Sequence, residues 1–206
     1  MNQDLIWALL LSWGAGIDLY LTVLLAGLVG RMQWLPLPSE LSFLANDWTL
    51  VLAAALFLVE FVADKIPYID SFWDAFHTFI RVPAGILLAL GAAHGMPQHR
   101  MFLVALAAGL VSFGTHGAKA SVRLALNSTP EPFTNWFVSF AEDGLVAIAY
   151  WLFLHHPWVL IFLIAAAVVM AWLTIYLLLQ FFKKLFRFLK PEELRQENWS
   201  PRPRRY

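Results

Sequence analysis

The sequence predicts an all-α integral membrane protein, a polytopic bundle of about six transmembrane helices. Hydrophobic residues make up 60% of its 206 residues and mean hydropathy is +0.66, whereas apolar residues make up about 45–50% of a soluble globular domain. Charged residues reach only 14%, too few to cover a water-soluble domain of this size. The composition therefore excludes an ordinary soluble globule and a disordered chain.

Six apolar stretches are long enough to cross a hydrocarbon core, which needs roughly 20 helical residues. They are separated by short turns rich in proline and polar residues, so neighbouring helices should be antiparallel. The first does not resemble a cleaved signal, because it begins near Asp4 and carries no base there. Pro83, inside the third, predicts a kink or a break. The expected spans are residues 5–29, 48–65, 71–95, 100–126, 134–155 and 157–182.

The charges divide the chain into a transmembrane bundle, residues 1–182, and a basic juxtamembrane tail, residues 183–206. The tail holds eight bases and three acids, and basic loops are retained in the cytoplasm. Six crossings then place both termini in the cytoplasm. The mixture of phenylalanines and bases after residue 180 is typical of a helix on a lipid surface. We expect a lipid bilayer as partner and no nucleic acid, and a homo-oligomer remains open.

Polar residues recur at helical spacing within the spans, where an ionisable group costs about 2.5–3.5 kcal/mol to insert. Two stripes of four have spacings of 4, 3, 4 and of 3, 4, 4, so each lies on one helix face: Asp70, Asp74, His77 and Arg81, then His116, Lys119, Arg123 and Asn127. Other spans contribute Asn135, Ser139, Glu142 and Asp143, then Glu60, Asp64 and Lys65, and finally Asp18. The depth of Asp18 argues against a helix-capping role. These faces should meet in a polar interior.

The interior is predicted to be net acidic, because seven acids, Asp18 among them, face four bases. A low dielectric does not allow this excess to be ionised without bound protons or a cation. We therefore expect a small-cation or proton-coupled transporter or channel. The expected ion or proton ligands are Glu60, Asp64, Asp74, His77, His116, Glu142 and Asp143. The expected charge-balancing groups are Lys65, Arg81, Lys119 and Arg123, and the polar lining is Asp18, Asp70, Asn127, Asn135 and Ser139.

Three other functions remain open. The four bases could grip the phosphate of a lipid or a polyprenyl phosphate from the cytoplasmic side. An intramembrane metal-dependent enzyme could use Asp74, His77, His116 and Glu142. An accessory or scaffold subunit would use the ion network for structure alone. The sequence identifies no catalytic residue and no cofactor, and it contains no cysteine that could bind a metal.

A weak internal repeat relates two helical hairpins. A shift of 63 residues superposes residues 59–67 on 122–130 and Trp73 on Trp136. Each unit is a helix that ends in polar groups, a proline turn and a second helix. Repeats of this kind, related by an axis along the membrane normal, occur in transporters.

Two long motif blocks resemble a known family. The first is VEFVADKIP at residues 59–67, continued by Asp70, WD at 73–74, HTFIR at 77–81 and PAG at 83–85. The second comprises HGAK at 116–119, Arg123, Asn127, STPEP at 128–132, Asn135 and ED at 142–143. Together they resemble the bacterial membrane family called domain of unknown function 4126. The resemblance implies a helical protein of the bacterial inner membrane and names no activity.

Overall fold

The computed structural model describes residues 3–66, 68–127 and 132–189, so residues 128–131 of the STPEP motif and the tail from residue 190 lie outside the described residues. Every regular element in the described ranges is a helix, which confirms the predicted all-α membrane bundle. The elements are α1 (Gln3–Ile17), α2 (Leu19–Arg31), the 3-10 helix η1 (Ser39–Ala45), α3 (Asp47–Ala63), α4 (Ile69–Ala92), α5 (Gln98–Leu126), α6 (Pro132–His155) and α7 (Pro157–Leu189).

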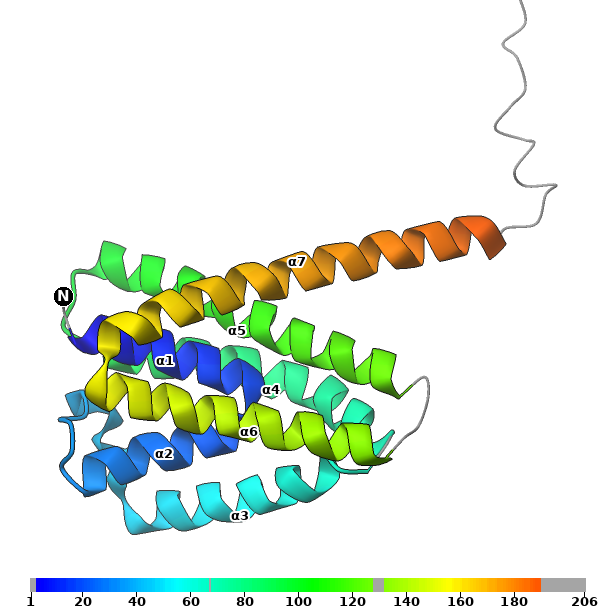
Figure 1. Ribbon diagram of the computed structural model, residues 1–206. Coiled ribbons are helices and arrows are strands. Elements are labelled where there is room, and N and C mark those ends of the chain that lie inside the picture. Colours follow the sequence, from blue (N-terminus) through cyan, green and yellow to red (C-terminus); the bar gives the residue numbers. More distant parts are fainter. Residues whose placement is uncertain (1–2, 67, 128–131, 190–206) are drawn as a thin grey trace, which may run out of the picture.

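The predicted first span is a helical hairpin. It breaks at Asp18, whose backbone is extended (φ −142°, ψ 104°) between α1 and α2. Trp7 Nε1 donates to the Pro36 carbonyl at 3.2 Å, although a continuous helix would separate these residues by about 43 Å. The start of α1 and the end of α2 therefore lie at the same end of the bundle (Figure 1). The single crossing predicted for residues 5–29 is wrong.

The number of predicted spans is supported only roughly by the described residues. Within the described residues, α4 to α7 are each long and apolar enough to span a membrane. The pair η1 and α3, bent by 67°, adds a fifth span if it is counted as one. In Figure 1, α3, α5 and α7 run in one direction and α4 and α6 in the other. The N-terminal end and the end of α7 consequently lie at opposite ends of the molecule.

Pro83 does not break α4, which is continuous from Ile69 to Ala92. A proline inside a helix removes one backbone donor, and neighbouring hydroxyls commonly bond the carbonyls near it in membrane helices. Here Ser112 Oγ of α5 donates to the Arg81 carbonyl at 3.2 Å. The packing of α5 against α4 thus adds a hydrogen bond two residues before the proline, and α4 continues without a break.

Helix α1 forms the centre of the bundle, in contact with α2 and α4 to α7. Its residues from Ile6 to Ile17 are buried, except Leu9. Near the start of α1 the core is apolar: the Trp7 ring lies 4.7 Å from that of Phe153, and Tyr150 donates to the Thr22 carbonyl at 2.7 Å. Near the end of α1 the neighbours are charged. The bundle therefore has an apolar half and a polar half.

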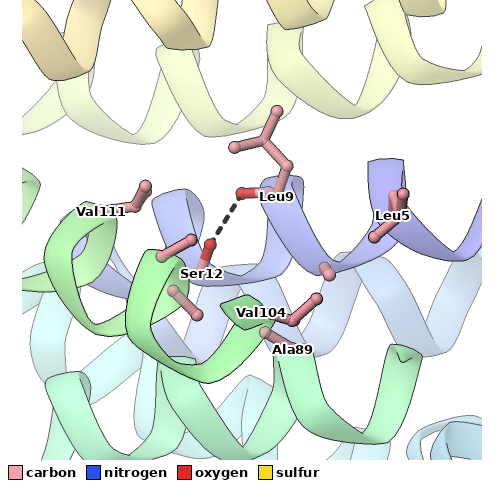
Figure 2. Close-up of a pocket in the computed structure, with 9 residues that line it drawn as sticks. Leu5, Leu9, Ser12, Ala89, Val104 and Val111 are labelled. Atoms are coloured by element: carbon pink, nitrogen blue, oxygen red, sulfur yellow. Dashed lines mark hydrogen bonds between the residues drawn. The ribbon is translucent and has the colours of Figure 1, made fainter. Parts of the chain in front are cut away.

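A cavity of about 190 Å³ lies in the apolar half, between α1, α4 and α5. Figure 2 shows Leu5, Leu9 and Ser12 of α1 on one side and Ala89, Val104 and Val111 on the others. Among the described residues that line it, Ser12 alone carries a hydroxyl, which donates to the Leu9 carbonyl at 3.1 Å. The cavity therefore offers little to an ion, and the candidate site lies elsewhere.

Candidate functional site

Eight charged residues meet in the polar half of the bundle, and we call them the charged cluster. Seven of them are buried, and Glu142 has a side chain 13% exposed. Because the predicted stripes on α4 and α5 face one another, these helices bring charges from distant parts of the sequence together. The cluster comprises Glu60 of α3, Asp64 at its C-terminal cap, Asp70, Asp74 and Arg81 of α4, Lys119 and Arg123 of α5, and Glu142 of α6.

Lys119 lies at the centre of the charged cluster. Its Nζ lies within 4 Å of five oxygen atoms: Asp64 Oδ2 at 3.0 Å, Ile17 O at 3.1 Å, Glu142 Oε2 at 3.4 Å, Glu60 Oε1 at 3.6 Å and Asp74 Oδ1 at 3.8 Å. Four of these oxygens belong to carboxylates. One ammonium therefore occupies an oxygen-lined space shared by four acidic residues and one main-chain carbonyl.

Arg81 joins the charged cluster to the hairpin tip, which is the break between α1 and α2 at Ile17 and Asp18. Its Nη2 pairs with Glu60, and its Nη1 lies 3.2 Å from Asp74 Oδ1. The same Nη1 donates to the Ile17 carbonyl at 3.1 Å. That carbonyl, at the end of α1, thus receives bonds from both Arg81 and Lys119, which suits the partial negative charge of a helix C-terminus.

Asp18 caps the other side of the break. Its Oδ1 accepts from the Leu21 backbone N–H at 2.8 Å, and it is 1% exposed. The expectation that depth prevents capping is wrong, because the bundle encloses a helix end within its interior. Gly16 permits this close packing: a Cβ there would collide with Thr115 and lie 2.7 Å from the Ser112 carbonyl.

Arg123 organises the outer part of the charged cluster. It donates to Glu142 Oε2 at 2.6 Å and to the Asp64 carbonyl at 2.8 Å, and it lies 3.6 Å from Asp70 Oδ2. Asp64 lies in the turn after α3. Burial alone would raise the pKa of the Asp64 carboxyl, but Lys119 and Arg123 outweigh burial and hold that pKa below its usual value.

An amide ladder continues from Asp70 toward the end of the bundle. Asn127 donates to Asp70 at 2.7 Å and to Ser71 at 2.7 Å, and Asn135 donates to Asp70 at 3.3 Å and to Asn127 at 3.0 Å. Ser71 and Asn127 also line a cavity of about 550 Å³ beside α7. Polar contacts therefore extend from this cavity to the hairpin tip.

Both predicted histidines are fully engaged. His77 Nδ1 lies 2.9 Å from the Trp73 carbonyl, and its Nε2 lies 3.0 Å from the Tyr20 hydroxyl. His116 contacts Thr78 at 2.7 Å through Nε2 and Arg81 at 3.2 Å through Nδ1. Among the described residues, no three histidine or acidic side chains are arranged to hold a metal ion. A metal bound to either imidazole would have to displace these contacts.

The charged cluster has more acid than base. Its five carboxylates face three cations, which leaves a net charge of −2 if all ionise. Several carboxylate oxygens are buried without a hydrogen bond: Glu60 Oε2, Asp64 Oδ1 and both oxygens of Asp74. Buried acceptors normally have partners, so these atoms mark where protons or cations would bind.

Lys65, Ser139 and Asp143 lie outside the charged cluster. Lys65 donates to Ser139 Oγ at 3.2 Å and to the Phe61 carbonyl at 2.9 Å. Burial lowers the pKa of the Lys65 ammonium, although Asp143 and Asp64 partly oppose this effect. These residues form a second group near the ends of α3 and α6.

The comparison with known families agrees with the two motif blocks. The family described as domain of unknown function 4126 matches residues 5–178, which is most of the chain. The protein belongs to this family. No curated protein and no solved structure matches the chain. The charged cluster lies entirely within the region matched by domain of unknown function 4126.

Sequence reasoning missed several groups at this site. Within the matched region of domain of unknown function 4126, the Ile17 carbonyl and the Tyr20 hydroxyl join the predicted polar residues. The sequence cannot show that the Ile17 carbonyl lacks its helical partner unless the break after α1 is already known. Asp18 could have predicted the helix break, because aspartate is a preferred N-cap residue and this one lies within an apolar run.

Proposed function

We propose that this protein binds protons and small monovalent cations in exchange at the charged cluster and moves them across the membrane. The observation that carries the proposal is the environment of the Lys119 ammonium, held by four carboxylates and the Ile17 carbonyl. Oxygen ligands of this kind suit hard cations. Lys119 would then compete with the transported cation for the same oxygens.

The charge of the cluster supports this proposal. Two further positive charges are needed to neutralise five carboxylates facing three bases, since a buried excess of negative charge is costly. Protons on Glu60 Oε2 and on either oxygen of Asp74, which are buried atoms without a hydrogen bond, would supply them. An arriving cation would release those protons, which couples the two species.

The hairpin supports it as well. Transporters often bind substrate where broken helices end inside the membrane, and the α1–α2 break contributes a carbonyl directly to the Lys119 site. Polar contacts connect this site to the 550 Å³ cavity, while the apolar core around Trp7 covers the other half. This asymmetry suits access from one side at a time.

The contacts favour this role over phosphate binding. The lipid-phosphate alternative needs free bases, but Arg81, Lys119 and Arg123 each pair with carboxylates. A purely structural network is the alternative that the flux assay below addresses.

We place the protein in the inner membrane with its basic tail in the cytoplasm. With α3 to α7 each crossing once, the hairpin lies nearer the outer side, and the N-terminus is outside. The earlier expectation of two cytoplasmic termini depended on a sixth crossing. The 550 Å³ cavity beside α7 would then open toward the cytoplasm.

Proteoliposomes loaded with a pH-sensitive dye test the proposed exchange. A Na⁺ or K⁺ gradient should change internal pH in wild-type vesicles, and Glu60→Gln should slow the change at least tenfold. Asp47→Asn is the matched control, because Asp47 is an exposed acid on the same helix. Equal rates for wild type and Glu60→Gln, or wild-type rates no faster than empty vesicles, would leave the network with a structural role.

A further inference from the structure

The Lys65 ammonium lies against two aromatic rings, those of Phe61 and the half-exposed Phe140. Its Nζ lies 3.0 Å from the centroid of the Phe61 ring and 4.5 Å from that of Phe140, and the two ring centroids are 5.5 Å apart. The same Nζ donates to Ser139 Oγ and to the Phe61 carbonyl. We call this arrangement of two rings and two oxygen acceptors the aromatic cage.

The aromatic cage has the chemistry of a binding site for a primary ammonium ion. Ring faces attract cations, and the hydroxyl and carbonyl oxygens accept two of the three N–H bonds of an ammonium group. Ser139 is fully buried. Trp136 donates to the Lys65 carbonyl at 3.1 Å, which fixes the backbone from which the lysine reaches into the cage.

The cage adjoins an acidic residue that has a buried oxygen without a hydrogen bond, Asp143. Asp143 lies one helical turn after Ser139, on the same face of α6, and its Oδ2 is buried without a hydrogen bond. The next residue toward the N-terminus, Glu142, belongs to the charged cluster. A cation leaving the cage would therefore meet Asp143 and then Glu142.

We propose that the aromatic cage is a peripheral binding site for small primary ammonium ions, and that the Lys65 ammonium, tethered to the chain, occupies it in the structure. This inference rests on the proposed function, since it identifies a cation class for the pathway that leads to Glu142. Lys65 fills the peripheral site, just as Lys119 fills the site at the centre of the charged cluster. Removal of the Lys65 side chain should leave a space that a free ammonium ion can fill.

Chemical rescue tests the inference. The Lys65→Ala variant in detergent is titrated with methylammonium chloride, and its thermal unfolding midpoint is measured against sodium chloride of equal ionic strength. Above its Kd, methylammonium should raise the midpoint with the logarithm of its concentration, by about 3 °C at tenfold excess over its Kd. Wild type, with the cage filled, should show no such rise beyond the sodium chloride effect.

The control is the double variant Lys65→Ala/Phe140→Leu, which lacks one ring and should lose the rescue. Lys65→Ser is read in the same way where the alanine variant gives no folded protein. An equal response in the single and double variants, or no methylammonium response beyond that of sodium chloride in either single variant, overturns the proposal. The measurement needs no transport, so failed flux at the charged cluster and failed rescue at the cage remain distinguishable.

Discussion

Two substitutions of Asp18 separate its capping role from its charge. In the structure its Oδ1 accepts the Leu21 N–H at the start of α2, at a position that is 1% exposed. Alanine removes the acceptor and leaves a buried N–H without a partner, whereas asparagine caps helices as well as aspartate does. The two variants should therefore differ in stability.

The size of the difference follows from the contact. Loss of an N-cap costs about 0.5–2 kcal/mol, and a buried unsatisfied donor costs about 1–3 kcal/mol. We expect Asp18→Ala to lower the free energy of unfolding by about 2 kcal/mol, which corresponds to about 4–8 °C for a chain of this length. Asp18→Asn loses only the charge beside the α2 dipole, less than about 1 kcal/mol.

Thermal unfolding of the purified variants in one detergent measures both values. Asp18→Asn should also retain cation-driven flux, because it preserves the hairpin tip. If the asparagine variant unfolds as early as the alanine variant, the carboxylate charge and not the cap is what α2 requires. That result would refute the capping argument.

Two further predictions concern packing and surface charge. Gly16→Ala should destabilise the protein by about 1–3 kcal/mol in the same unfolding assay, because the new Cβ collides with α5, whereas Gly144→Ala, with open space around it, should be neutral or slightly stabilising; equal effects would contradict the close approach of α1 and α5. Asp47→Asn removes an exposed ion pair with Arg31 and should cost no more than about 0.5 kcal/mol, and a larger loss would show that this pair matters more than its exposure suggests.

The polar interior could be predicted because charge is costly in a membrane. The spacings of Asp70, Asp74, His77 and Arg81 are visible in sequence, and all four are buried together as expected. Burial of a charge requires partners, so such stripes must face one another. This reasoning located the charged cluster without any knowledge of the tertiary structure.

The helix break could not be predicted from hydropathy. Asp18 is the only charged residue among residues 5–29, which are otherwise mostly apolar, and such a run is expected to cross because a helix end in lipid exposes unsatisfied backbone groups. That reasoning fails for α1, which is enclosed by other helices. Arg81 and Lys119 bond the carbonyl freed at Ile17, so the break costs little.

The internal repeat stays a prediction. Asp64 and Asn127, which the 63-residue shift superposes, each form the C-terminal cap of a helix. Their roles then differ, since Asp64 binds Lys119 whereas Asn127 bonds Asp70. The shift also pairs Glu60 with Arg123, which have opposite charges. The two units therefore resemble each other in helical arrangement but not in the interactions of their superposed residues.

Proton release on cation addition tests the central claim most directly. Weakly buffered protein in detergent receives Na⁺ or K⁺ while an indicator dye reports pH. A cluster with five carboxylates and three bases should release about one to two protons per chain, and Glu60→Gln or Asp74→Asn should reduce that number. An unchanged pH with both cations would contradict the account.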